Sequence, residues 1–134
     1  MYPLLDIKNL SIDFVSASGT TNALKNISLT VNRNEIVALV GESGSGKSVT
    51  ALSILQLLPS PPANYSSGEI LFSKNGSQQS DLLQKDHLSL QRIRGNKIGM
   101  IFQEPMTSLN PVLTCGEQVM EAILAHKKNI GSNR

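Results

Sequence analysis

Apolar and polar residues alternate near the start of the chain, as they do in a strand with one buried face. The alternating apolar residues form two sets that are one position out of phase: Leu5 and Ile7, then Leu10, Ile12 and Phe14. A slip of one position would turn the second set to the wrong face, so we expect a bulge or short turn near Lys8 and Asn9. A loop is expected at residues 16–20.

The next patterns change from a half-buried strand to fully buried elements. Residues 27–31 alternate and predict a second half-buried strand, and residues 32–35 contain two asparagines that suit a tight turn. Residues 36–40 are an unbroken apolar run, which is typical of a buried parallel strand. Residues 47–58 are apolar on most of a helical surface and predict a buried helix, ended by the prolines that follow.

Shorter patterns predict the remaining elements. Residues 68–72 should form a strand, and the polar residues 73–81 an exposed hairpin tip or insertion without chemistry. A short helix is expected within residues 86–93 and another strand at residues 97–102. The Thr-x-x-Glu pattern of residues 114–117 is a capping box and should open the last helix.

Composition narrows the class of protein. The 134 residues are 40% hydrophobic and 16% charged, so they can build the core of one domain. The net charge of +2 is too small to indicate nucleic acid as a partner. Cys115 is the only cysteine, which excludes an internal disulfide. No apolar stretch approaches the roughly 20 residues of a membrane span, and the N-terminus lacks the basic start of a secretory signal. We therefore expect a cytosolic chain that touches a membrane only through partners.

Residues 41–48, Gly-Glu-Ser-Gly-Ser-Gly-Lys-Ser, match the phosphate-binding pattern G-x-x-x-x-G-K-[ST] at every fixed position. The backbone N–H groups of such a loop turn toward a phosphate chain, and the helix after it directs its positive dipole end at the same anion. Lys47 is expected to reach the β- and γ-phosphates, and the Ser48 hydroxyl to ligate Mg²⁺. A flexible linker is the alternative, but the apolar run before the loop and the helix after it favour the phosphate site.

Gln103 follows the expected strand at residues 97–102 and precedes a loop that contains a proline. Ligands of parallel α/β sheets bind at the carboxyl ends of the strands. A neutral amide there can ligate Mg²⁺ and hydrogen-bond an attacking water. On position alone, a merely solvated residue at the strand end is the open alternative.

Residues 101–111, IFQEPMTSLNP, resemble the Q-loop of ATP-binding-cassette (ABC) transporter ATPases, and more narrowly that of the oligopeptide and dipeptide importer branch. Residues 40–55, 57–62 and 94–102 look most like the N-terminal ATPase half of Yej-type importers of peptides and of the peptide antibiotic microcin C. The similarity covers residues 5–128.

The resemblance implies a fold and a division of the chain. The fold would be the N-terminal portion of an α/β P-loop NTPase: a parallel core strand, an antiparallel β subdomain and the start of a helical subdomain. Residues 1–134 would form a partial ABC ATP-binding domain. Within it, residues 1–102 would hold the β subdomain and the P-loop core, and residues 103–134 the Q-loop and the start of the helical subdomain.

The same resemblance implies ATP and Mg²⁺ as cofactors. Gln103 would sense the γ-phosphate and Mg²⁺; it is the catalytic candidate and, with Ser48, a metal candidate. Phe14 would stack on adenine, with packing into the core as its alternative role. The nucleotide-binding candidates are Phe14, Gly41, Ser43, Gly44, Ser45, Gly46, Lys47, Ser48 and Val49.

The partners implied by the resemblance are those of a peptide importer. They are transmembrane permease subunits, a second ATPase domain bound head to tail and, indirectly, a periplasmic peptide-binding protein, with no nucleic acid. The chain would lie peripherally at the cytoplasmic face of the inner (plasma) membrane.

Three family motifs are absent from the sequence: the Leu-Ser-Gly-Gly-Gln signature, the Walker B strand with its Asp-Glu pair, and the switch histidine. Whether the chain alone is an ATPase is therefore undecided. It is expected to be either a portion of an importer ATPase or a truncated, non-catalytic remnant with weak or no nucleotide binding. A GTPase or small kinase is disfavoured, because residues 96–99 lack the aspartate of the guanine-specifying Asn-Lys-x-Asp pattern.

Three other residues receive no functional role. Glu104 follows a predicted strand, but the general base of the family comes from a different strand. His126 is interpreted as a surface histidine of the last helix. Cys115 lies beside a helix start and is treated as structural.

Overall fold

The computed structural model describes residues 1–103 and 109–127. The chain divides into two compact units, Met1–Leu90 and Gln91–Arg134, and each is described by itself.

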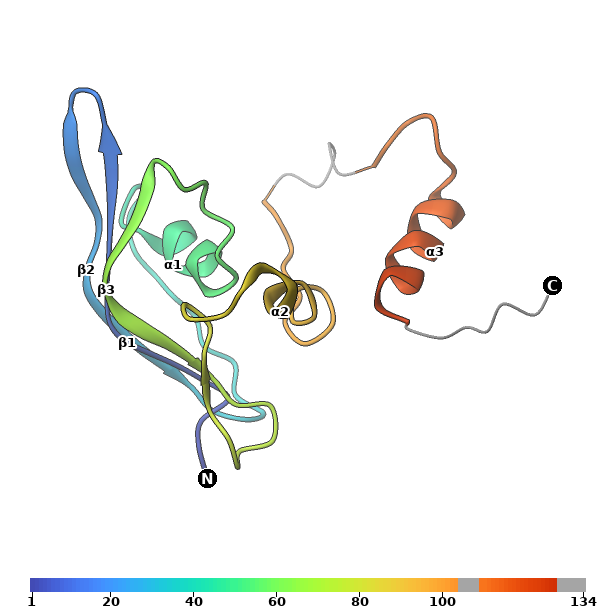
Figure 1. Ribbon diagram of the computed structural model, residues 1–134, viewed down its shortest axis with the longest axis horizontal. Coiled ribbons are helices and arrows are strands. Elements are labelled where there is room, and N and C mark those ends of the chain that lie inside the picture. Colours follow the sequence, from blue (N-terminus) through green and yellow to red (C-terminus); the bar gives the residue numbers. More distant parts are fainter. Residues whose placement is uncertain (104–108, 128–134) are drawn as a thin grey trace. The chain divides into compact units, whose positions relative to one another are not determined.

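A four-stranded antiparallel sheet is the framework of the first unit (Figure 1). Its strands lie side by side in the order β2-β1-β3-β4. Their bounds are β1 Leu5–Ser16, β2 Gly19–Val31, β3 Ala63–Phe72 and β4 Ser80–Asp81. β1 therefore lies between two long partners, which satisfy its backbone groups on both sides.

The bulge predicted from the phase slip is confirmed. The register of β1 shifts between Ile7 and Leu10 against β2, and between Lys8 and Ser11 against β3. Asn9 adopts a positive φ of 48° inside this irregularity. The bulge returns Leu10 to the buried face, where its side chain is 0% exposed.

Two strands are longer than their hydrophobic patterns predict. β2 begins at Gly19 rather than near residue 27, and β3 begins at Ala63 rather than near residue 68. The early residues of both strands pair with the second half of β1, for example Phe14 with Thr21 and with Ala63. Pairing between distant segments thus extends the strands through polar stretches that carry no local strand pattern.

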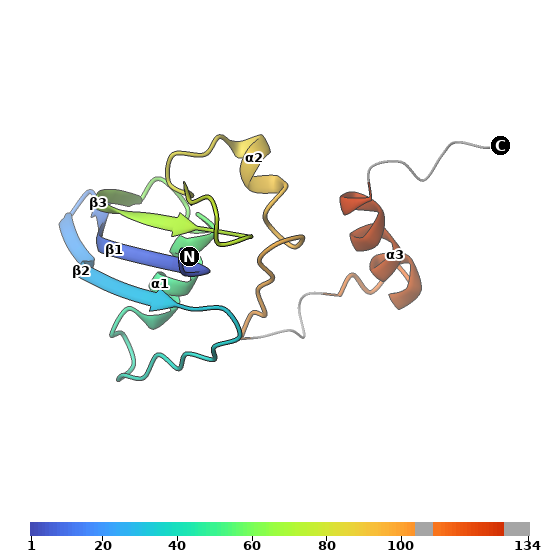
Figure 2. The same cartoon turned by 90° about the horizontal axis from the view of Figure 1, so that it is seen from below.

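Helix α1, Lys47–Ile54, lies against one face of this sheet in both views (Figures 1 and 2) and contacts β2. It begins where the sequence predicts but ends at Ile54 instead of Leu58, so the prolines are not what stops it. Gln56 adopts a φ of 48°. Its N–H donates to Ser53 O (3.0 Å), and that of Leu57 donates to Leu52 O (3.0 Å), which is a Schellman stop. The buried core consists of Ile7, Leu10, Ile12, Leu24, Leu55, Leu58, Ala63, Ile70, Phe72, Leu82 and Leu90.

The parallel core strand expected at residues 36–40 is not formed. The segment has no regular structure, and Ile36 and Val40 are 98% and 90% exposed. A parallel strand needs a neighbouring strand for its hydrogen bonds and cover on both faces, and none of the described strands pairs with this segment. The strand expected at residues 97–102 is likewise reduced to a bridge between Arg94 and Ile98.

The remaining helices agree with the sequence. α2, His87–Gln91, falls within the predicted range, and α3 is Cys115–His126. The capping box of α3 is complete: Thr114 Oγ1 accepts from the Glu117 N–H (3.2 Å), and Glu117 Oε2 accepts from the Thr114 N–H (2.8 Å). Within the described residues, none of the helices has the length and apolarity needed to cross a membrane.

Candidate phosphate-binding site

The motif loop follows the irregular segment at residues 36–40 and leads directly into α1. Residues 41–46 are in neither a helix nor a strand. Gly44 and Gly46 have φ of 81° and 89°, conformations that side chains strongly disfavour. A Cβ on Gly41 would lie 2.6 Å from Ser45 Oγ. The path of the loop therefore requires glycine at positions 44 and 46.

Lys47 folds its side chain back over this loop. Its Nζ donates to the carbonyl oxygens of Gly41 (2.7 Å) and Glu42 (2.5 Å) and to Ser45 Oγ (3.2 Å). The Ser45 N–H also donates to Glu42 O (3.2 Å), which closes a turn inside the loop. The ammonium charge is thus held at the concave backbone of the motif.

The start of α1 adds donors beside this charge. Gly46 is the N-cap and has no side-chain cap, and the first turn contains no acidic residue. The first N–H groups of a helix lack partners within the helix and favour an anion. Ser48 is exposed in this turn, whereas Val49 is half-buried. This set of groups fits a Mg²⁺-bound polyphosphate: an ammonium, helix-terminal N–H groups, an exposed hydroxyl and two glycines in left-handed conformations.

Phe14 lies on the same face of the sheet as this helix start. A Cβ on Gly46 would lie 2.6 Å from Leu24 Cδ2, so the end of the loop rests on β2 at Leu24. Leu24 pairs with Ile12, and Phe14 follows Ile12 at the next position on that face of β1. Phe14 is half-buried, which leaves part of its ring accessible.

Gln103 belongs to the second unit, where it is exposed in a bend. The structure therefore places Phe14 and the phosphate loop in the same unit and on one face of its sheet, and it describes Gln103 separately. Glu104 lies outside the described residues. Cys115 is exposed as the first residue of α3, and for His126 only the backbone is described.

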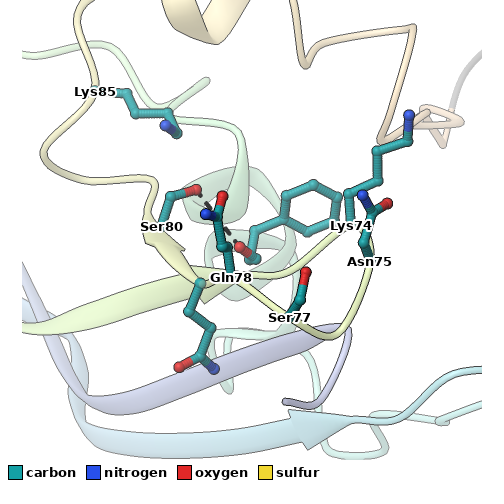
Figure 3. A pocket seen from close by; sticks show the side chains of 8 residues that line it. Lys74, Asn75, Ser77, Gln78, Ser80 and Lys85 are labelled. Atoms are coloured by element: carbon teal, nitrogen blue, oxygen red, sulfur yellow. Dashed lines mark hydrogen bonds between the residues drawn. The ribbon is translucent and has the colours of Figure 1, made fainter. Parts of the chain in front are cut away.

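A separate polar hollow of about 340 Å³ opens beside the connection between β3 and β4 (Figure 3). Its lining carries amides, hydroxyls and two ammonium groups: Phe72, Lys74, Asn75, Ser77, Gln78, Gln79, Ser80 and Lys85. The sequence pattern assigned no chemistry to this stretch. None of the motif residues lines the hollow, so it is distinct from the phosphate loop.

Comparison with known proteins identifies the family. Residues 24–132 match the family described as ABC transporter. The chain belongs to this family. Because the match includes the phosphate loop and most of the described elements, the family and fold class predicted from the sequence, an N-terminal portion of an ABC ATPase, are confirmed.

Two relatives are similar in sequence over most of this chain. The oligopeptide transport ATP-binding protein OppD of Bacillus subtilis (strain 168) is 43% identical over 93% of this chain and 34% of its own length. YejF of Escherichia coli (strain K12), named as an uncharacterized ABC transporter ATP-binding protein, is 50% identical over 92% of this chain and 22% of its own.

A solved structure shows the same fold. The dimeric structure of MJ0796, a bacterial ABC transporter cassette, matches with a TM-score of 0.75 and 29% identity, over 96% of this chain and 50% of its own. The chain thus spans half or less of the length of each of these ABC proteins.

Proposed function

We propose that this chain is the ATP-binding portion of an ABC transporter ATPase subunit that energises peptide import. The observation that carries the proposal is the phosphate loop. Gly44 and Gly46 adopt left-handed conformations, the Lys47 ammonium lies 2.7 Å from Gly41 O, and α1 begins at Lys47. This arrangement supports polyphosphate binding, and the family match supports ATP rather than another phosphate ligand.

The proposed division of labour follows from the chemistry of each residue. The loop N–H groups of residues 41–48 and the Lys47 ammonium would hold the phosphates, Ser48 would ligate Mg²⁺, and Phe14 would stack on adenine. Gln103 would contact Mg²⁺ and orient the attacking water as the catalytic and second metal residue. Bound Mg²⁺–ATP would supply the phosphoryl transfer that powers transport.

Peptides are the cargo that the relatives support. OppD is named for oligopeptide transport, and other relatives are named as putative peptide import proteins of Brucella and glutathione import proteins of Salmonella. Within this class, the resemblance to Yej-type importers makes microcin C-like peptides the narrower proposal.

The partners and location follow from this function. We propose permease subunits at the cytoplasmic face of the inner membrane, and indirectly a periplasmic peptide-binding protein. A second ATPase domain is supported by the dimeric state named for MJ0796. The domain division at residues 102 and 103 also remains a proposal.

The test is peptide uptake in cells whose own gene carries Lys47→Ala. Uptake of a labelled tripeptide and sensitivity to microcin C should both be lost. The matched control is Lys25→Ala, which removes an equal charge from an exposed position of β2. Normal peptide uptake in the Lys47→Ala cells would contradict the proposal of a peptide importer. Loss of peptide uptake with unchanged microcin C sensitivity would contradict only the proposal that microcin C-like peptides are the cargo.

A further inference from the structure

The end of the phosphate loop approaches the sheet where Gly46 lies against β2. A Cβ on Gly46 would lie 2.6 Å from Leu24 Cδ2 and 3.1 Å from the Ala23 carbonyl oxygen. Gly46 is also the N-cap of α1. Any movement at this contact therefore moves the end of the loop together with the start of α1 at Lys47.

One of the register shifts between β1 and β2 lies at this contact. The register between β1 and β2 jumps from Ile12 opposite Leu24 to Asp13 opposite Asn22. Ala23 is thus an extra residue in β2, as in a β-bulge, and bulges redirect neighbouring side chains. Leu24 is 4% exposed next to Ile12 at 0%, so its side chain faces inward against the helix.

The hydrogen bonds within the motif do not tie it to the sheet. The bonds of Lys47 run to Gly41, Glu42 and Ser45, and the Ser45 N–H donates to Glu42. They fix the shape of the loop. The contact between Gly46 and Leu24 instead links the loop to β2, and so bears on the position of the loop relative to β1 and Phe14.

We infer that Leu24, presented by the bulge at Ala23, is a positioning residue for the phosphate loop. It contacts no ligand and acts through Gly46, setting the distance between the N-terminus of α1 and Phe14. The inference rests on the proposed function, because it concerns how the same site holds ATP.

The test compares Leu24→Ala with Leu10→Ala in the full chain. Leu10 is a buried leucine of the neighbouring strand, 0% exposed. It borders the bulge near Asn9, and none of its atoms lies within 4 Å of a Cβ placed on Gly46. Both variants should lower the melting temperature. Only Leu24→Ala should weaken Mg²⁺–ATP binding, by at least about tenfold, and Leu24→Met should restore the affinity to within about threefold of the parent.

If Leu24→Ala does not fold, Leu24→Val takes its place in the comparison. Leu24→Val should lower the ATP affinity by about threefold or more. Equal ATP affinity for the parent and a folded Leu24 variant, or an equal loss with Leu10→Ala, would overturn the inference. These outcomes differ from failure of the proposed function, in which the parent chain itself would not bind Mg²⁺–ATP.

Discussion

At the scale of single residues, the site depends on a few side chains with separable tasks. Lys47 already makes three hydrogen bonds to its own loop. Phosphate oxygens would replace part of this set, so binding exchanges bonds to neutral oxygens for bonds to charged ones. Both kinds of bond are charge-assisted because the ammonium is ionised, but a bond to an anionic oxygen adds the attraction between opposite charges. The affinity for ATP should therefore depend strongly on this ammonium.

Phe14 should act on the base and not on the phosphates. Stacking of a base on an aromatic ring is worth roughly 1–3 kcal/mol, so Phe14→Ala should weaken ATP binding by at least about fivefold. Binding of inorganic triphosphate should change little, and Phe14→Tyr should retain ATP binding. Parallel titrations with the two ligands measure this difference. Unchanged ATP affinity in Phe14→Ala would assign the ring to core packing alone.

Gln103 should affect turnover more than binding. In the assembled transporter, Gln103→Ala should lower ATP hydrolysis at least about tenfold, because phosphoryl transfer depends on positioning and charge stabilisation. ATP affinity should stay within about threefold, since the loop carries ground-state binding. Gln91→Ala, at an exposed position of α2, is the control. Wild-type turnover in Gln103→Ala would remove Gln103 from the catalytic set.

At the scale of elements, the sequence predicts correctly those features that depend on a few adjacent residues. The bulge of β1, the start of α1 and the capping box of α3 each follow from a few adjacent residues, and all three are confirmed. The family and fold class are confirmed as well.

Elements that depend on distant pairing were predicted less well. β3 starts at Ala63 because β1 supplies its partner, which no pattern within residues 63–67 reveals. Residues 36–40 have the composition of a core strand but lack a partner among the described strands. For the site, the motif located the loop, whereas the contact of Gly46 with Leu24 arises only from the folded sheet.

The capping box of α3 should respond to acid. The Thr114 N–H, and then the Thr114 hydroxyl, hydrogen-bond the Glu117 carboxylate and hold the pKa of that carboxyl below its ordinary value. Because the pKa is lower in the folded chain, this stabilisation is complete above the unfolded value of about 4.3. It is lost as the pH falls through the folded value.

An NMR titration of the Glu117 carboxyl checks this prediction. The parent should titrate below the ordinary glutamate range, and Thr114→Ala should raise the pKa by removing the hydroxyl donor. Helical signals at the start of α3 should weaken over the same pH interval. A carboxyl pKa at or above the ordinary value in the parent would show that the capping box is not formed in solution.

At the scale of the whole molecule, the candidate functional residues are divided between the two units. Met1–Leu90 contains the phosphate loop, its contact with β2 and Phe14, and Gln91–Arg134 contains Gln103 and α3. Nucleotide binding is therefore a property that the first unit should show through its own residues. Under the proposed function, hydrolysis and transport would also need Gln103 and the proposed partners.

The most direct measurement is calorimetric titration of Mg²⁺–ATP into the full chain, its Lys47→Ala variant and the Lys25→Ala control. A charge-assisted hydrogen bond contributes roughly 1.5–3 kcal/mol. The parent and Lys25→Ala should therefore bind equally, and Lys47→Ala at least about tenfold more weakly. Equal affinity of all three proteins, or no binding by the folded parent, would contradict the central claim that this loop is an ATP site.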